Sequence, residues 1–184
     1  MLFFVSTNPN KIDKAELFLR PLGIPFEVSN IKLIEIQSDS VEEIVIDKAK
    51  KAFQILNSPL LVNDHVWSIS ALNGFPGPYM KYINQWFSPQ DFLNLMKNKK
   101  DREMKLTEYI CYTDGNIYKT FFEEIKGHVL FASKGKGEPW KTVSSYSKDN
   151  SSVAEKLETH PSAIGTSKVY EDFAKWYKGV ALSS

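Results

Sequence analysis

The chain has 184 residues, of which 42% are hydrophobic and 24% charged, and its formal net charge is +1. This length and composition predict a globular domain with a sizeable core rather than a disordered chain. The small net charge argues against a general nucleic-acid binder or a basic membrane-surface protein. No apolar run approaches the roughly 18 residues that a membrane-spanning helix needs. The single cysteine, Cys111, excludes an internal disulfide and fits a cytoplasmic location.

The first half of the chain alternates predicted strands with predicted helices. Short apolar or β-branched runs indicate the strands, and apolar residues that recur every three or four positions indicate the helices. Ser40 and Glu43 have the spacing of a capping box, which predicts the start of the second helix. The first run, Leu2 to Ser6, is too short for a signal peptide and lacks its basic start. The expected strands are 2–6, 26–36 and 60–62, a polar turn is expected at 7–11, and the expected helices are 12–20 and 40–56.

The second half is expected to combine a helix, a long hairpin and further helices. Pro89 stands at the first position of a helix that Ser88 would cap. Asp114-Gly115 lies between two runs rich in β-forming residues, and this dipeptide is a strong hairpin signal. The expected strands are 104–112, 117–125 and 127–131. Two further helices are expected to start at Ser88 and Ser152, and a third to span 162–178. Residues 134–150 are expected to be irregular. This order of elements predicts a mixed α/β fold in a single domain, 1–184.

A polar cluster follows the first expected strand. Thr7, Asn8 and Lys11 provide a hydroxyl, an amide and an ammonium just before a helix. In open α/β sheets ligands bind at the carboxyl ends of strands, and a helix N-terminus attracts phosphate. The cluster could therefore cradle a phosphate, or it could be an Asn/Pro turn that caps the helix. It contains no glycine, so it is not a Walker loop.

A second group of charged residues surrounds the expected end of the strand at 60–62. Asn63 and Asp64 follow that strand directly, where an acid can bind a divalent cation, take a proton from water, or simply cap the next segment. Lys48 lies along the apolar stripe of its helix and either extends to solvent or points at a phosphate or at Asp64. Glu35 is either a further metal-binding carboxylate or an exposed residue on a strand.

Together these segments resemble the inosine triphosphate pyrophosphatases, a family that hydrolyses non-standard purine nucleoside triphosphates. The stretch "ALNGFPGPY", 71–79, fits the family pattern A-L-x-G-x-P-G-x-Y, which follows an acidic pair. The family's T-x-N-x-x-K pattern is matched by Thr7, Asn8 and Lys11, although here the threonine and asparagine are adjacent. The resemblance covers roughly residues 2 to 130.

The resemblance implies a two-lobed mixed sheet flanked by helices, with a nucleotide cleft between the lobes. It also implies a magnesium-dependent homodimer that releases nucleoside monophosphate and pyrophosphate. Asp64 would be the general base, and Lys48 its charged neighbour. By position, the resemblance assigns catalysis to Asp64 and Lys48, magnesium to Glu35, Asn63 and Asp64, and substrate binding to Thr7, Asn8, Lys11 and Trp140.

The chain departs from the family pattern at residues matched to magnesium binding and at residues matched to base recognition. Asn63 replaces the first member of the acidic pair, so magnesium affinity is expected to fall, because an amide oxygen brings no negative charge. The family's aromatic-Gly-aromatic-Asp-Pro motif is matched only by "EPWKT", in which Glu138 and Lys141 are charged and Trp140 alone remains aromatic.

The family's residues that recognise a 6-oxo purine are also changed. Pro161 stands where relatives have a lysine, and residues 165–167, "GTS", stand for Ser-His-Arg. A buried charged donor discriminates between bases because the wrong base leaves it without a hydrogen bond. Loss of such a donor should therefore relax base discrimination. The sequence therefore predicts an enzyme with altered base specificity. The alternative is a catalytically impaired nucleotide-binding or regulatory protein on the same fold.

Overall fold

The structure, a computed structural model, describes residues 1–159 and 168–181. The chain divides into two compact units. Unit 1 comprises Met1–His65, Glu108–Glu123 and Thr166–Ser184, the last range only as far as it is described. Unit 2 comprises Val66–Thr107 and Glu124–Gly165, with the same restriction at its end.

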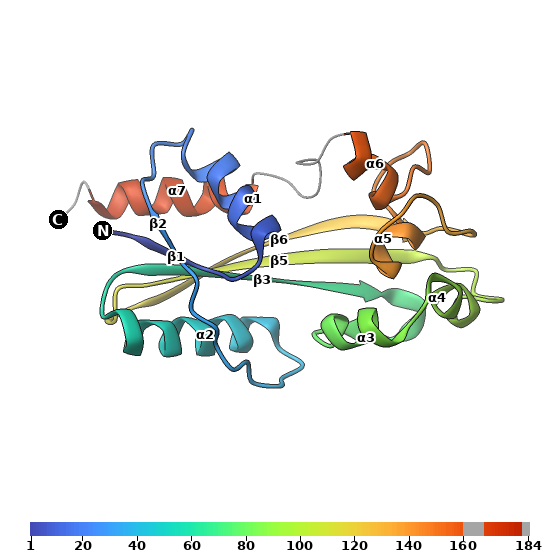
Figure 1. Cartoon of the computed structure of the whole chain (residues 1–184), viewed down its shortest axis with the longest axis horizontal. Coiled ribbons are helices and arrows are strands. Elements are labelled where there is room, and N and C mark those ends of the chain that lie inside the picture. The colour runs from blue at the N-terminus through green and yellow to red at the C-terminus, as the bar shows by residue number, and fades with distance from the viewer. Residues whose placement is uncertain (160–167, 182–184) are drawn as a thin grey trace. The chain divides into compact units, whose positions relative to one another are not determined.

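Helices and strands are interspersed along the chain, as expected for a mixed α/β protein (Figure 1). The strands are β1 (Phe3–Val5), β2 (Glu27–Ser29), β3 (Leu60–Ile69), β4 (Pro76–Gly77), β5 (Glu103–Thr113), β6 (Tyr118–Val129) and β7 (Ser144–Ser145). The helices are α1 (Pro9–Leu19), α2 (Val41–Leu56), the 3-10 helix η1 (Ser70–Leu72), α3 (Met80–Trp86), α4 (Pro89–Leu95), α5 (Pro139–Val143), α6 (Val153–Thr159) and α7 (Lys168–Ala181). The predicted α/β fold is confirmed.

Unit 1 is a sheet covered by helices on both faces. β1 lies between β2 and β3 and is parallel to both, and β5 and β6 follow β3 in the sheet. α1 and α7 lie on one face of these strands and α2 lies on the other (Figure 1). Phe4, Leu19 and Phe173 belong to the core on the first face, and Val45 and Val62 to the core on the second. A sheet that is buried on both faces requires the continuous apolar runs that these strands carry.

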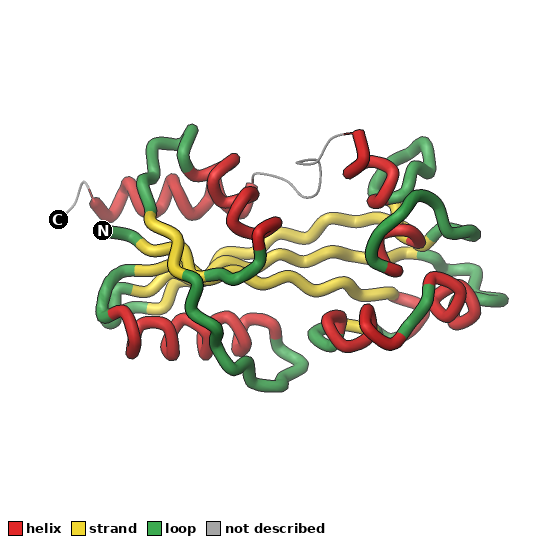
Figure 2. Tube along the Cα trace, in the orientation of Figure 1, coloured by secondary structure: helices red, strands yellow, loops and turns green. Residues whose placement is uncertain are grey.

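Local signals account for the helix starts in unit 1. The Ser40 hydroxyl accepts a bond from the Glu43 amide at 3.3 Å, so the predicted cap of α2 is confirmed. α1 begins at Pro9, inside the stretch predicted as a polar turn, because Asn8 caps it and proline suits a first helical position. β2 is much shorter than predicted from 26–36. Residues 30–40 form a loop (Figure 2), since β1 offers only three residues with which to pair.

β3 is longer than the predicted strand at 60–62. Its first three residues pair with β1, and Val62 is the partner of Val5. The strand then continues to Ile69 and pairs near its end with β4. Asn63 and Asp64 therefore lie inside a strand, but just beyond the last residue that pairs with β1. The prediction of a strand end was wrong, while the position at the carboxyl end of β1 is as expected for a ligand site.

Unit 2 is built around an apolar cluster. β4 pairs antiparallel with β3, and β7 pairs antiparallel with β6 at Val129 and Ser144. The segments predicted as a strand at 127–131 and as irregular chain at 134–150 proved different. Residues 127–129 are the end of β6, and the second segment contains β7 and α5, of which α5 contributes to the core. The cluster includes Trp67, Phe92, Met104, Trp140 and Val143.

The Gly/Pro turn that follows η1 has a conformational reason for its glycines. Gly74 and Gly77 have φ angles of 90° and 56°, which glycine adopts without steric cost. Asn73 lies in the same left-handed region at 54°, where asparagine is tolerated better than most residues. This turn brings β4 back to pair with β3.

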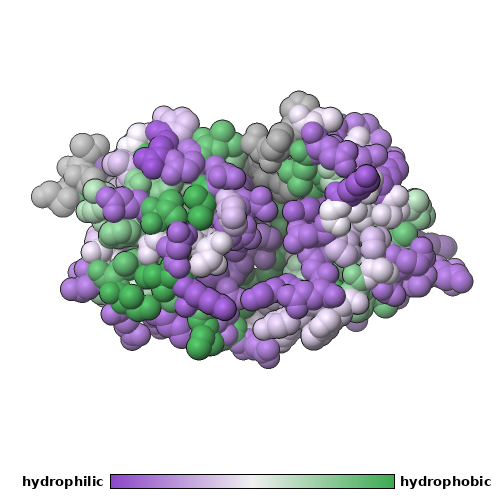
Figure 3. All heavy atoms as spheres, in the orientation of Figure 1, coloured by the Kyte–Doolittle hydropathy of each residue, from purple (hydrophilic) through white to green (hydrophobic). Residues whose placement is uncertain are grey.

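The visible surface carries mostly hydrophilic side chains, with apolar ones among them (Figure 3). Such a mixture is normal for a globular protein. Within the described ranges, no helix combines the length and the apolar character needed to cross a membrane.

Candidate functional site

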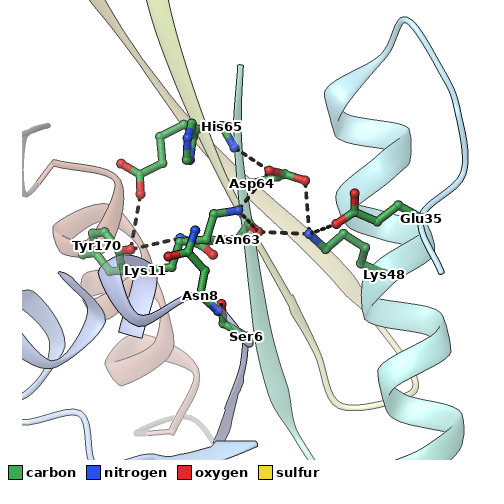
Figure 4. A network of polar contacts seen from close by, with 10 residues as sticks. Ser6, Asn8, Lys11, Glu35, Lys48, Asn63, Asp64, His65 and Tyr170 are labelled. Atoms are coloured by element: carbon green, nitrogen blue, oxygen red, sulfur yellow. Dashed lines mark hydrogen bonds and ion pairs between the residues drawn. The ribbon is translucent and has the colours of Figure 1, made fainter. Parts of the chain in front are cut away.

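Two lysines from two helices converge on one carboxylate in unit 1 (Figure 4). The Lys11 ammonium of α1 lies 3.0 Å from Asp64 Oδ1, and the Lys48 ammonium of α2 lies 3.1 Å from Oδ2. Both ammoniums also approach the main-chain oxygen of Asn63, at 3.3 and 3.4 Å. β3 thus supplies acceptors, and the helices on its two faces supply donors. The structure brings together Lys11, Lys48 and Asp64. The contact of Lys48 with Asp64 is one of the alternatives that the sequence left open, and the contact of Lys11 with Asp64 was not predicted.

Lys48 links a second carboxylate to this group. Its ammonium lies 3.0 Å from Glu35 Oε1, while its side chain is largely buried. Burial alone would lower the pKa of Lys48, but the charges of Asp64 and Glu35 outweigh it and raise that pKa. Lys48 is therefore a permanent cation between two acids, and the alternative of a lysine that extends to solvent is wrong.

Asp64 is held in its ionised form. Burial favours the neutral acid, but the Lys11 and Lys48 ammoniums outweigh it and hold the pKa of Asp64 well below its usual range. The amide of His65 also donates to Asp64 Oδ1 at 2.8 Å. Burial, together with the nearby Lys11 cation, lowers the pKa of His65 to about 3, so this imidazole is neutral at pH 7.

The polar residues before α1 make hydrogen bonds that cap this helix. Asn8 Oδ1 accepts a bond from the Asn10 amide at 3.0 Å, and the Asn8 amide donates to the Ser6 hydroxyl at 3.2 Å. Asn8 therefore performs the capping role that was the alternative to phosphate binding. Thr7 is exposed in the turn before the helix. Phosphate contacts from Thr7 and Asn8 stay predictions.

The side chain of Asn63 takes part in a polar network that was not predicted (Figure 4). Its Nδ2 lies 3.4 Å from the Tyr170 hydroxyl, which lies 3.2 Å from Glu108 Oε1. Lys14 pairs with the other oxygen of Glu108. Two signals in the sequence could have indicated it: Lys14 follows Lys11 by one helical turn, and Glu108 interrupts an apolar strand.

The donor set suits magnesium only when a substrate helps to bind it. No group of three or more His, Cys, Asp or Glu side chains forms a metal site in the described part of the chain. Glu35 and Asp64 nevertheless approach the same ammonium, and magnesium is commonly held by one or two carboxylates together with phosphates and water. Asn63 Oδ1 is buried and accepts no hydrogen bond from any described residue. Its use as a metal ligand stays a prediction.

The predicted base-binding segment lies in unit 2 and is packed differently from a stacking platform. Trp140 is 5% exposed, and its ring centroid lies 6.0 Å from that of Trp67 in the apolar cluster. Glu138 and Lys141 pair with each other at 2.7 Å. Pro161 and residues 165–167 lie outside the described residues. Base stacking by Trp140 stays a prediction, and its observed surroundings are those of a core residue.

Residues 2–160 match the Ham1 family. A dITP/XTP pyrophosphatase from Methanopyrus kandleri is 31% identical over 180 residues, which is 96% of each chain. Another, from Thermococcus kodakarensis, is 31% identical over 136 residues, 74% of this chain and 73% of the relative. A solved HAM1 protein from Coxiella burnetii superposes with a TM-score of 0.81 at 20% identity, covering 97% of this chain and 100% of the other. The last similarity concerns the fold alone.

Proposed function

This chain belongs to the Ham1 family, and on that premise we propose that it hydrolyses non-canonical purine nucleoside triphosphates to the monophosphate and pyrophosphate. Its class, a nucleoside triphosphate pyrophosphatase, is that of relatives named dITP/XTP and inosine triphosphate pyrophosphatase. The resemblance found in the sequence is thereby confirmed. The observation that carries the proposal is the position of Asp64 between the Lys11 and Lys48 ammoniums.

Lys11 and Lys48 would bind the phosphate chain. A triphosphate carries several negative charges and strong acceptor oxygens, so it competes with Asp64 for both ammoniums. The N-terminus of α1 adds partial positive charge close to Lys11. Substrate binding would therefore remove one or both ammoniums from Asp64.

Asp64 would then act as the base. A carboxylate that two ammoniums hold is a weak base, because both cations lower its pKa. When phosphate takes these cations, a carboxylate oxygen of Asp64 is free to accept a proton from water. The oxygen of that water enters the monophosphate or the pyrophosphate, and the anhydride bond between the α- and β-phosphates breaks.

Glu35 and Asp64 are the carboxylates that would hold magnesium. A bound magnesium ion supplies charge neutralisation on the phosphate oxygens. Glu35 keeps one oxygen for this role, because its contact with Lys48 uses Oε1. The same family resemblance supports a homodimer and a cytoplasmic location, which gel filtration and fractionation would test.

Base choice is proposed to be relaxed relative to the family. Glu138 and Lys141 occupy the places of an aromatic ring and an aspartate, and the pair they form offers no surface for stacking. Lost stacking is worth roughly 1–3 kcal/mol by analogy with other base-stacking proteins. We therefore expect the preference for inosine triphosphate over ATP and GTP to fall below about a hundredfold in kcat/KM, which is roughly 2.7 kcal/mol.

The experiment is a panel of nucleoside triphosphates incubated with the protein and magnesium, followed by chromatography of the products. The proposed function requires equal amounts of monophosphate and pyrophosphate. Diphosphate and inorganic phosphate would contradict it. Tight nucleotide binding without turnover would instead favour a regulatory protein on the same fold.

A further inference from the structure

A chain of four polar side chains lies beside the proposed site, within unit 1. It runs from Asn63 Nδ2 to the Tyr170 hydroxyl at 3.4 Å, from that hydroxyl to Glu108 Oε1 at 3.2 Å, and from Glu108 to the Lys14 ammonium. Asn63 is 2% exposed, Glu108 4% and Tyr170 0%. We call this chain the Tyr170 relay.

The hydrogen bonds of the Tyr170 relay have only one possible direction. An amide N–H can only donate and an ionised carboxylate can only accept, while the tyrosine hydroxyl has a single hydrogen. Tyr170 must therefore accept from Asn63 and donate to Glu108. Burial and the neighbouring Glu108 charge raise the pKa of Tyr170, which keeps this hydroxyl protonated. The Tyr170 hydroxyl can satisfy both contacts because one of its partners is an amide and the other is an acid.

The relay connects the elements that carry the site. Lys14 follows Lys11 by three residues on α1, so both lysines lie on the same side of that helix. Asn63 precedes Asp64 on β3, and Tyr170 is on α7, which packs against α1. None of the hydrogen bonds of Glu108 or Tyr170 reaches the Asp64 carboxylate. They can act on it through the backbone that they hold.

We propose that Glu108 and Tyr170 are positioning residues that orient Asn63 and hold α1 where Lys11 reaches Asp64. The same relay allows an acid at position 63 or at position 108, but not at both. Replacing Asn63 by aspartate would place two acceptors around one hydroxyl hydrogen. One buried carboxylate would then lack its hydrogen bond and would face a second negative charge. When Glu108→Gln is added, the direction of the relay can reverse, because the new amide would donate to Tyr170, and Tyr170 to the new carboxylate.

The first test is a cycle of unfolding measurements with Asn63→Asp, Glu108→Gln and the double variant in urea at pH 8. In the native background, Asn63→Asp should raise the unfolding equilibrium constant by about tenfold or more, as expected for a lost hydrogen bond to a charged group. In the Glu108→Gln background, the same substitution should change it less than about threefold.

Equal costs in the two backgrounds would overturn the one-acid rule. If Asn63→Asp does not fold, the double variant decides. A folded double variant supports the proposal, and an unfolded one contradicts it.

The second test measures positioning by the binding of inorganic tripolyphosphate, which requires no turnover and rests on the proposed function. Tyr170→Phe removes the hydroxyl, and Tyr112→Phe is the matched control from the same core cluster. Tyr170→Phe should weaken binding about three- to tenfold, the range for one hydrogen bond, while Tyr112→Phe stays near the wild-type value. Equal affinity of both variants would overturn the positioning role. If the wild-type protein binds no tripolyphosphate, the proposed function fails, and the unfolding cycle still decides the relay.

Discussion

Units 1 and 2 differ in the polar side chains that they bury. Among the described residues, the buried charged side chains, Lys48 and Glu108, belong to unit 1, each paired with an opposite charge. The buried polar side chains of unit 2 are hydroxyls, and its core is formed by aromatic and aliphatic residues. Buried charge is costly, so groups of buried and paired charges often mark sites of chemistry. The contrast favours phosphate chemistry in unit 1 and a mainly structural role for the region around Trp140.

The largest effect on stability is expected in unit 2. Trp140→Ala should lower the free energy of unfolding by about 3–5 kcal/mol, because it leaves a cavity beside Trp67 in a closely packed cluster. Urea denaturation measures this loss. The milder Trp140→Phe is used for kinetics, where kcat and KM should stay close to wild type. An increase in KM for some bases and not for others would show that Trp140 contacts the substrate. That result would contradict a mainly structural role for this part of unit 2.

In unit 1, removal of the Lys48 charge should affect activity more than any surface lysine does. Lys48→Met leaves Asp64 and Glu35 without their shared cation and removes a phosphate partner. A truncated partner of a buried charge pair typically costs about 2–5 kcal/mol, so kcat/KM should fall by about thirtyfold or more. Lys105→Met, which breaks a more exposed pair with Glu124 in unit 2, is the control. Similar kinetics of the two variants would contradict the assignment of the site.

A smaller effect is expected at Glu35. Glu35→Gln keeps the shape of the side chain but removes a charge that magnesium favours, so the magnesium concentration for half-maximal activity should rise several-fold. Glu27→Gln, an exposed acid on β2, is the matched control. A titration of activity against magnesium gives both midpoints. If they coincide, Glu35 has no part in binding the metal.

The smallest effect concerns pH. The folded pKa of His65 is about 3, below the ordinary value of 6.5, so the folded state resists protonation of this imidazole. Its contribution to stability is present above pH 6.5 and is lost as the pH falls toward 3. Because His65 is partly exposed, we expect a loss of about 1–2 kcal/mol as the pH falls through this range. His65→Gln should remove this part of the pH dependence, and His128→Gln should leave it in place. Parallel curves for wild type and His65→Gln would show that His65 contributes nothing.

Sequence patterns were sufficient where a residue's role depends on its neighbours in the chain. Ser40 and Ser88 cap helices as their spacing predicts, and the 114–115 turn joins β5 and β6. Lys48 and Asp64 were candidates from their places along a helix and after a strand, but each kept a structural alternative, since nothing local distinguishes a buried lysine from one that reaches solvent. The structure then showed their contact.

The Tyr170 relay and the packing of Trp140 could not be predicted in the same way. Tyr170 is 107 positions from Asn63 and 62 from Glu108, so no local spacing relates them. Trp140 follows a proline in a polar stretch, which reads as loop, and only the tertiary contact with Trp67 buries it. Tertiary packing decides such positions, whatever the local pattern indicates.

Whether Asp64 is the base of the reaction is decided by the turnover of dITP by Asp64→Asn, compared with wild type and with Asp13→Asn, an exposed acid on α1. The three proteins are mixed with dITP and magnesium, and the initial rate of pyrophosphate release is measured. We expect wild-type rates for Asp13→Asn. For Asp64→Asn we expect a fall of about a hundredfold or more, as for the loss of a general base, in a protein that still unfolds cooperatively in urea. Release of pyrophosphate by Asp64→Asn at the wild-type rate would contradict the assignment of Asp64 and with it the proposed mechanism.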